Sequence, residues 1–243
     1  GRTVLGTPSG TLLARYTSGG LLDATFGTGG IIIDSTIPQM AYVNALSIQS
    51  DDKIVVVGKS TSPDIMLTRY TANGALDTTF DNDGKVITDF GGNETAEAIT
   101  IAPDGKIIIS GWSLNTNYTF VLARYNTDGS HDTTFDSDGK VTTGFGGLSG
   151  ASSYAISIQE DGKLVAAGYI RYFNDNDKPG DFAFARYNNN GSLDVTFGEN
   201  GLGTVDFNAG SDSAYALCIQ ADGKIIAAGR SDADFALMRL LAQ

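Results

Sequence analysis

Short apolar runs follow one another along the whole chain, separated by connections rich in glycine, asparagine and aspartate. One complete set lies at residues 140–145 (KVTTGF), 154–159 (YAISIQ), 163–168 (KLVAAG) and 182–187 (FAFARY). Such runs, rich in Val, Ile, Thr, Phe and Tyr and bounded by turn residues, are typical of β-strands. No segment has the periodicity of an amphipathic helix, so the pattern predicts an all-β protein.

The four runs recur in the same order, and we name them D, A, B and C. Run A alternates between apolar and polar positions, whereas run B is apolar on both faces, which predicts that run B is buried between layers. An Asp-Gly pair separates run A from run B at Asp104, Asp161 and Asp222 and favours a tight hairpin. The copies lie at residues 31–35, 85–90, 140–145 and 202–207 (D), 44–49, 98–102, 154–159 and 215–220 (A), 53–58, 106–111, 163–168 and 224–229 (B), and 11–16, 65–70, 120–125, 182–187 and 235–240 (C).

An Arg-Tyr pair ends the copies of run C, at Arg15, Arg69, Arg124 and Arg186, with a degenerate copy at Arg239. These arginines are 54, 55, 62 and 53 residues apart. A period of this length with several strands per unit indicates a repeat architecture. Repeated four-stranded antiparallel units without helices predict a β-propeller, because the coils of a β-solenoid, the competing repeat fold, are much shorter.

The ends of the chain leave the number of blades open. Residues 2–6 (RTVLG) look like a run B, which gives eighteen expected strands, two more than four blades and two fewer than five. A short blade, a longer native chain, or ends that pair with another molecule would each explain this count. We predict five blades, one of them incomplete, in a single domain at residues 1–243, with repeat units at about 1–30 (partial), 31–84, 85–139, 140–201 and 202–243.

Composition narrows the choice of partners. The 31 glycines suit many tight turns, and the formal net charge of −12 disfavours nucleic acid and anionic membranes as partners. No apolar run approaches the roughly 18–20 residues of a membrane span, so we expect no membrane insertion. Cys218 is the single cysteine and has no internal disulfide partner, and a chain that begins at Gly1 is expected to be a processed or excised piece.

The segments ARYN, DTTF and DGK stand at fixed offsets, with the consensus FxLARYNxDGSLDxTFGxxGKVxTDFGG…AxAIxIQPDGKIVxAG, and together they resemble the delta-60 repeat family. The resemblance covers essentially the whole chain. It departs at Leu240, which replaces the tyrosine, at the insert near Asn174, and in the incomplete terminal units. It implies a bacterial, extracellular or cell-surface β-propeller, and it carries no catalytic residue over to this chain.

Each complete Arg-Tyr pair is followed by an Asp-x-Thr-Phe motif whose aspartate lies eight residues after the arginine, as in Arg124 and Asp132. We expect a bidentate guanidinium–carboxylate pair that fixes the C–D loop. The alternative is that the aspartate caps its own turn. Because a catalytic site is rarely built four times, the pair is interpreted as scaffold. Cys218, as a small side chain in a small pocket, and His131, the single histidine, are also interpreted as structural.

Two Asp-x-Asp-Gly loops offer closely spaced carboxylates, Asp81 with Asp83 and Asp136 with Asp138, as a calcium loop would. The equivalent loops at residues 27–29 and 198–200 lack these ligands, and no distant glutamate completes an EF-hand. Solvated turns are therefore the favoured interpretation, with calcium binding in two of the units as the alternative. No other cofactor is expected.

One end of the antiparallel units varies from copy to copy. Antiparallel strands place the B–C and D–A loops together, and large, different side chains follow the run-B glycine there. Loops on a rigid scaffold concentrate function, and aromatic, arginine and carboxylate side chains suit a binding site, so we expect a protein or glycan partner at this rim. The predicted rim residues are Lys59, Trp112, Tyr169 and Arg230, with Arg171, Tyr172, Asp175 and Asp177 from an insertion at residues 170–180.

Three functions remain open at this stage. The first is a non-enzymatic, secreted or cell-surface module that binds a partner or has a structural role. The second is a subunit of an extracellular filament that self-associates by strand exchange at unclosed ends. The third is a carbohydrate-active enzyme with carboxylates at the propeller axis, for which Asp34, Asp89 and Asp206 are the candidates if run D is innermost.

Overall fold

The computed structural model describes residues 2–7, 10–34, 40–146, 149–172, 180–207 and 210–241. These residues form eighteen β-strands in five sheets, and none of them lies in a helix. In every sheet, chain neighbours pair antiparallel, so each sheet is a simple meander. The all-β prediction is confirmed. None of the described residues belongs to a helix that is long and apolar enough to cross a membrane.

The first sheet contains β1 (Arg2–Thr7), β2 (Gly10–Arg15) and β3 (Ile31–Asp34). The second contains β4 (Met40–Ile48), β5 (Ile54–Ser60), β6 (Ile65–Tyr70) and β7 (Lys85–Thr88). The third contains β8 (Asn93–Ile101), β9 (Ile107–Leu114), β10 (Tyr118–Tyr125) and β11 (Lys140–Thr143). The fourth contains β12 (Ser149–Ile158), β13 (Leu164–Tyr172), β14 (Asp181–Tyr187) and β15 (Leu202–Val205), and the fifth contains β16 (Asp212–Ile219), β17 (Ile225–Ser231) and β18 (Asp234–Leu240).

Each complete sheet consists of runs A, B, C and D in that order. Run D therefore joins the sheet that precedes it, and the sequence repeats that begin at residues 31, 85, 140 and 202 cut each of the first four sheets before its last strand. Five blades are present, as predicted. Among the described residues, the first sheet has no run A and the fifth has no run D, so two blades rather than one have three strands there.

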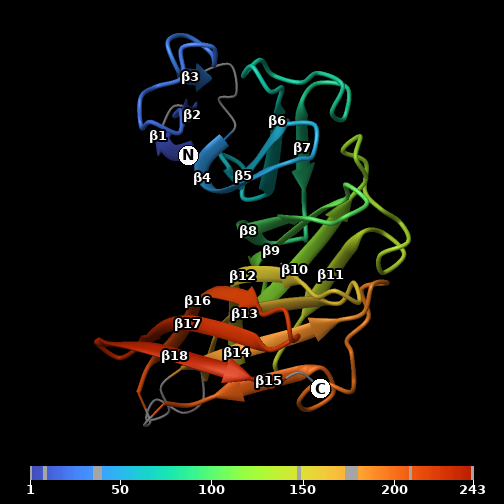
Figure 1. Ribbon diagram of the computed structural model, residues 1–243. Coiled ribbons are helices and arrows are strands. Elements are labelled where there is room, and N and C mark those ends of the chain that lie inside the picture. Colours follow the sequence, from blue (N-terminus) through green and yellow to red (C-terminus); the bar gives the residue numbers. More distant parts are fainter. Residues whose placement is uncertain are drawn as a thin grey trace.

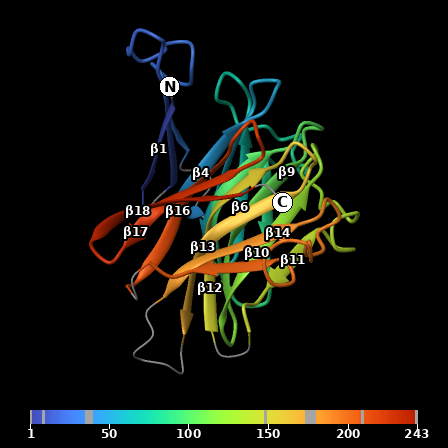
Figure 2. The same cartoon turned by 60° about the horizontal axis from the view of Figure 1, so that its bottom comes forward.

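The sheets pack face to face in chain order, with their A strands in series at the inner edge. β4 contacts β8, β8 contacts β12, and β12 contacts β16. The strands form an open arc, with the first sheet at one end and the fifth at the other (Figure 1; Figure 2 gives a second view), and β1 and β2 pack against β4 of the second sheet.

Run D is consequently at the outer edge of each sheet, which corrects the idea of carboxylates at the axis. Asp34 pairs with Thr11 in the first sheet, as Thr88 pairs with Ile65 in the second. Asp34 is therefore the equivalent of Thr88. Asp89 and Asp206 lie one position further along, just beyond β7 and β15. The three aspartates therefore do not line the axis. They also do not occupy equivalent positions, because Asp34 lies one residue earlier in its D strand than Asp89 and Asp206 do in theirs.

Apolar side chains fill the space between successive sheets. Ile65 and Leu67 of the second sheet pack with Ile107 and Ile109 of the third. Equivalent clusters lie between the third and fourth sheets and between the fourth and fifth. The central strands β5, β9 and β13 are buried on both faces over most of their length, as the doubly apolar run B predicts.

The repeated arginine joins each blade to the next. Arg124 Nε lies 2.7 Å from Asp132 Oδ2, and Arg124 Nη1 donates to the carbonyl oxygen of Asn189 in the following sheet at 2.5 Å. The second carboxylate oxygen of Asp132 accepts from the backbone N–H and the hydroxyl of Thr134. The predicted bidentate pair is thus wrong in detail. One aspartate oxygen takes the arginine and the other caps the turn, while the rest of the guanidinium reaches across the blade interface.

A buried tyrosine hydroxyl makes a second tie between blades. The tyrosine that ends run C bonds to the D strand of the preceding sheet, with Tyr125 Oη 2.7 Å from Thr88 Oγ1 and Tyr187 Oη 2.8 Å from Thr143 Oγ1. Both tyrosines are fully buried. These recurring contacts explain why the Arg-Tyr pair repeats, and they identify it as scaffold.

Candidate ligand-binding surface along the inner strands

A β-bulge interrupts the inner strand of each sheet from the second to the fifth. The register of β12 with β13 jumps from Ser153–Gly168 to Ala155–Ala167, which leaves Tyr154 as the extra residue. Corresponding jumps leave Asn44, Glu97 and Tyr215 unpaired in β4, β8 and β16. A bulge bends the strand and redirects the side chain of the extra residue.

A glycine on the neighbouring B strand makes each bulge possible. A Cβ on Gly111 would lie 1.9 Å from the carbonyl oxygen of Thr95, and Gly58, Gly168 and Gly229 have the same 1.9 Å approach to their partner strands. No other residue fits there without moving the inner strand. The run-B glycine recurs because two backbones come into close contact at this point.

Beside each bulge stands the residue that follows the glycine on the B strand. These two positions differ from sheet to sheet and form one continuous surface, which we name the inner band. Its members are the bulge residues Asn44, Glu97, Tyr154 and Tyr215 and the B-strand residues Lys59, Trp112, Tyr169 and Arg230.

Ring contacts join the three tyrosines of the band. Tyr154 stacks on Tyr169 of its own sheet, with ring centroids 5.7 Å apart and planes inclined by 11°. On the other side it contacts Tyr215 of the fifth sheet at 5.5 Å. In the third sheet, Trp112 Nε1 donates to Glu97 Oε1 at 3.1 Å, and Tyr118 packs beside the indole at 5.3 Å. The tyrosine rings therefore join the fourth and fifth blades, and the indole of Trp112 lies on the third.

Charged groups are few in the band, and their environments differ. Burial raises the pKa of Glu97, although the hydrogen bond from Trp112 works in the opposite direction. Burial, followed by the nearby Tyr169 and Glu97, raises the pKa of Tyr154, so its hydroxyl is neutral at physiological pH. Lys59 Nζ lies 5.9 Å from the centre of the Trp112 ring and bonds to Asn93 Oδ1 at 2.5 Å. The surface is mainly aromatic and hydroxylic, with a cation at each end.

The predicted rim residues belong partly to this band. Lys59, Trp112, Tyr169 and Arg230 do, but they lie within strands rather than loops, because β5, β9, β13 and β17 continue past the glycine. Arg171 and Tyr172 also lie in β13, with Arg171 exposed and Tyr172 Oη donating to Asp181 Oδ2 at 2.7 Å. Asp175 and Asp177 lie outside the described residues.

Sequence reasoning did not assign the four bulge residues to the site. The apolar–polar pattern predicts ordinary strand positions for Tyr154 and Tyr215 at the start of run A, because a bulge leaves no mark in such an alternation. The available signal was the variation of one position, Asn44, Glu97, Tyr154 and Tyr215, just before a run that otherwise repeats closely.

The predicted calcium loops have the geometry of capped turns. Asp83 Oδ1 accepts from the backbone N–H of Lys85 at 2.9 Å, and Asp138 Oδ1 accepts from that of Lys140 at 2.9 Å. Asp81 and Asp136 are exposed and have left-handed backbones, with φ of 46° and 48°. Among the described residues, the groups of three carboxylates that lie close enough to share an ion contain none of these four.

Cys218 and His131, which the sequence predicts to be structural, do not lie together in one site. Cys218 is exposed, which corrects the expectation of a small pocket, because the outer face of the fifth sheet has no described sheet beside it. His131 is half-buried with Nε2 3.4 Å from Thr88 Oγ1, and burial lowers its pKa. Its contact with the ring of Tyr125, at 5.0 Å, belongs to the blade interface.

Stacked four-stranded meanders whose first strands line the inner side define a β-propeller type of repeat protein. The chain belongs to the family described as domain of unknown function (DUF5122) beta-propeller. The family model matches residues 49–80, 102–135, 159–197 and 220–243, together more than half of the chain. The propeller class expected from the repeats is thereby confirmed, whereas the likeness to delta-60 repeats stays a resemblance.

Solved structures resemble the chain in fold. An endo-arabinase from Bacteroides thetaiotaomicron VPI-5482 matches with a TM-score of 0.53 and 10% identity over 100% of this chain and 89% of its own. The extracellular domain of a putative one-component system from B. thetaiotaomicron matches at 0.48 and 12%, over 98% of this chain, which spans only 25% of that protein's chain. A putative gluconolactonase matches at 0.44 and 14%, over 91% and 68%. No curated protein matches the chain significantly.

Proposed function

We propose that this chain is a non-enzymatic binding module of a secreted or cell-surface bacterial protein and that its inner band binds a neutral glycan. The observation that carries the proposal is the position of Tyr154, which touches Tyr169 within its sheet and Tyr215 in the next. Trp112 adds an indole on the preceding sheet, where it donates to Glu97. The extracellular setting rests on the resemblance of the repeats to a family of bacterial surface proteins.

The chemistry of the band suits sugars. Aromatic rings offer flat apolar faces to the C–H faces of sugar rings, while hydroxyl, amide and carboxylate groups nearby bond to sugar hydroxyls. The band holds both kinds of group, since Glu97 and the tyrosine hydroxyls lie among the rings. A net charge of −12 disfavours polyanionic ligands, so a neutral glycan is the better candidate.

A binding role is favoured over hydrolysis. Glycosidases place two acidic groups on either side of the scissile bond. Among the members of the inner band, Glu97 is the single carboxylate, and the equivalent positions are Asn44, Tyr154 and Tyr215. One carboxylate among aromatic rings supports recognition of a sugar and supplies only half of the acid–base pair that hydrolysis requires.

A glycan array tests the proposal, with binding then quantified by calorimetry. Trp112→Ala and Tyr154→Ala should each weaken binding roughly tenfold or more, about 1.4 kcal/mol. Tyr16→Ala is the matched control, because Tyr16 is exposed and lies in the first sheet after β2, outside the band. Absence of any glycan ligand, or affinity unchanged in both band variants, would refute the proposal. Binding of peptides alone would redirect it to a polypeptide partner.

A second candidate function is assembly with another sheet, and one feature of the fifth sheet favours it. Phe235 and Leu237 on β18 are 76% and 58% exposed. Their equivalents in the fourth sheet, Phe182 and Phe184, are buried against the fifth. Since β18 is also the edge of a three-stranded sheet, both its apolar face and its backbone groups are available for pairing.

Light scattering across protein concentrations tests this second function. The chain should associate as concentration rises, and the double substitution Phe235→Ser with Leu237→Ser should restore the monomer. A parent chain that stays monomeric at all concentrations would exclude assembly through this sheet.

A further inference from the structure

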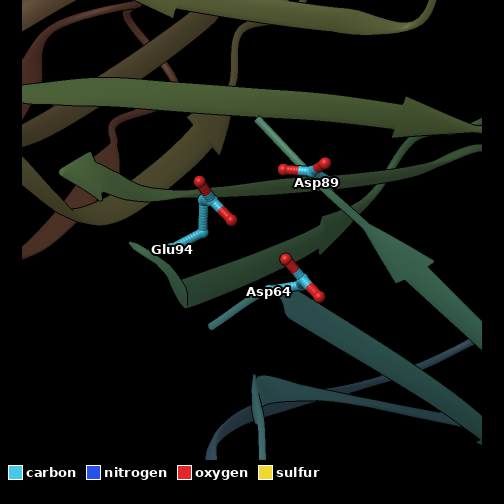
Figure 3. A group of neighbouring side chains, drawn as sticks. All are labelled: Asp64, Asp89 and Glu94. Carbon is cyan, nitrogen blue, oxygen red and sulfur yellow. The ribbon is translucent and has the colours of Figure 1, made fainter. Parts of the chain in front are cut away.

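Three carboxylates meet between the second and third sheets. Asp64 directly precedes β6, Asp89 directly follows β7, and Glu94 is the second residue of β8. One oxygen from each lies within 4.8 Å of those of the other two. Figure 3 shows the three carboxylate groups turned toward a common space, although they come from three separate segments. We name this group the acidic triad.

The triad extends from the core to the surface. Glu94 is 0% exposed, Asp64 is half-buried and Asp89 is exposed. Glu94 Oε1 accepts from Gly92 N at 2.6 Å and from Ser113 Oγ at 3.0 Å. Glu94 Oε2 is buried and has no hydrogen-bond partner among the described residues. Burial raises the pKa of Glu94, and the negative charges of Asp89 and Asp64 raise it further.

No described lysine or arginine forms an ion pair with the triad within 4.0 Å. Lys140 Nζ reaches the main-chain oxygen of Asp89 at 3.1 Å, and the ion pair found for its side chain is with Asp138. Three like charges are therefore held close together, one of them buried. A buried carboxylate oxygen without a partner is costly, and so is charge repulsion at this separation. A bound cation would remove both costs.

The same triad recurs two sheets further along. Asp181, Asp206 and Asp212 occupy the equivalent positions between the fourth and fifth sheets, and they too offer oxygens within 4.8 Å of one another. Between the third and fourth sheets the equivalent residues are Thr119, Gly144 and Ala151. The acidic residues thus occur as a complete set of three or not at all. If Glu94 only capped the loop at Gly92, the carboxylates of Asp64 and Asp89 would not be needed. Coordination of one shared ion requires all three carboxylates.

We propose that Asp64, Asp89 and Glu94 bind a calcium ion that joins the second blade to the third, and that Asp181, Asp206 and Asp212 form a second site of the same kind. Carboxylate oxygens without histidine or cysteine select a hard cation. Calcium holds its oxygens at about 2.3–2.6 Å, so two ligands of one ion lie at most about 5 Å apart, which fits the triad. Magnesium demands a smaller and more regular shell, at about 2.0–2.1 Å.

Thermal unfolding of the full chain, after treatment with a chelator, tests the first site directly. Calcium chloride at about 100 times its dissociation constant should raise Tm by roughly 5–10 °C for each occupied site, and equal magnesium should give a smaller shift. Calorimetry should report two calcium ions per chain. Asp89→Asn, at an exposed position, should remove one of the two and reduce the Tm shift. Glu94→Gln should do the same while raising Tm in the absence of calcium, because it removes a buried charge.

Asp81→Asn is the matched control, because it makes the same change in charge and shape in one of the Asp-x-Asp-Gly turns. It should leave calcium binding unchanged. The proposal is overturned if calcium gives neither heat nor a Tm shift, or if magnesium acts equally well. It is also overturned if Asp89→Asn retains both ions while Asp81→Asn loses one, since the ion would then lie in the turn. Should Glu94→Gln fail to fold, the exposed Asp89→Asn decides alone.

Discussion

A methyl group on Gly168 would lie 1.9 Å from the carbonyl oxygen of Ser152, because the bulge at Tyr154 presses the inner strand against its neighbour. The same relationship holds at Gly111 and Thr95. A very close backbone approach in each of these blades therefore lies directly beneath the inner band. The bulge in the inner strand therefore determines both the packing of the two backbones and the position of the side chains of the inner band.

Gly168→Ala should destabilise the protein by about 1–3 kcal/mol or more, because the added atom forces the two backbones apart. It should also weaken any ligand of the band, since Tyr154 and Tyr169 would lose their stacking geometry. Equilibrium unfolding in urea measures the first effect. Gly203→Ala is the control, because its Cβ would meet nothing nearer than a ring carbon of Phe197 at 3.9 Å. Equal stability of the two variants would show that the inner strand can move aside.

The sequence predicted the scaffold well because each structural contact recurs. Arg124, Asp132 and Tyr125 have copies in three other units, and comparing the copies was enough to interpret the Arg–Asp pair as scaffold. That the arginine and the tyrosine bond across the blade interfaces was not predicted. The strand count was also right. The position of run D was not predicted, because nothing in a repeat shows whether its first strand joins the preceding sheet or the following one.

The candidate sites were predicted only in part, for two physical reasons. The bulge redirects Glu97 and Tyr154 without any change of residue type that a strand pattern reveals. The acidic triad is built from segments of two sheets, so Asp64 and Glu94 become neighbours only after the blades have packed. The signal available in the sequence was that the same acidic positions recur at Asp181 and Asp212. Using this signal requires knowing that these two repeat units, and not their neighbours, are the ones to compare.

The aspartate of the repeated ion pair should make stability depend on acid pH. Burial alone would raise the pKa of Asp77, but hydrogen bonds from Thr79 and the nearby Lys53 and Arg69 lower it to about 2. A depressed folded-state pKa contributes stability that is complete above the ordinary value of 3.8 and is lost as pH falls through about 2. This contribution is about 2 kcal/mol.

Asp77→Asn tests this dependence. At neutral pH the variant should lose about 3–5 kcal/mol, because Arg69 is left buried without its carboxylate. The difference from the parent chain should narrow by about 2 kcal/mol toward pH 2, where the parent carboxyl has become about half protonated in the folded state. Unfolding midpoints measured in urea from pH 2 to pH 7 report it. A constant difference across that range would show that Asp77 is not titrating in the folded state as inferred.

Loss of one buried hydroxyl should weaken a blade interface. Tyr125→Phe removes the 2.7 Å contact with Thr88 Oγ1 and leaves a buried polar group with fewer partners. The expected cost is about 1–2 kcal/mol of unfolding free energy. Tyr42→Phe, the same change at a tyrosine that is 65% exposed, should cost less than about 0.5 kcal/mol. If both substitutions had the same small effect, the hydroxyl would not be a tie between blades.

The hydrogen bond between Trp112 and Glu97 gives the inner band its own optical probe. Trp112 is the single tryptophan of the chain, so its fluorescence reports this position alone. Its indole N–H donates to Glu97 Oε1 at 3.1 Å, and burial raises the pKa of that carboxyl above its usual value. The emission should therefore change as acid protonates Glu97, with a midpoint above 4.5.

Glu97→Gln should abolish this fluorescence titration while keeping an acceptor for the indole. Because a raised folded-state pKa means that the charged carboxylate is the costly form, the variant should also be slightly more stable at neutral pH. Glu160→Gln, at an exposed hairpin turn, is the control and should leave the titration intact. A ligand of the band should shift the midpoint in the parent chain, since it covers the carboxyl. A titration that survived in Glu97→Gln would assign the optical change to another group and remove Glu97 from the band's chemistry.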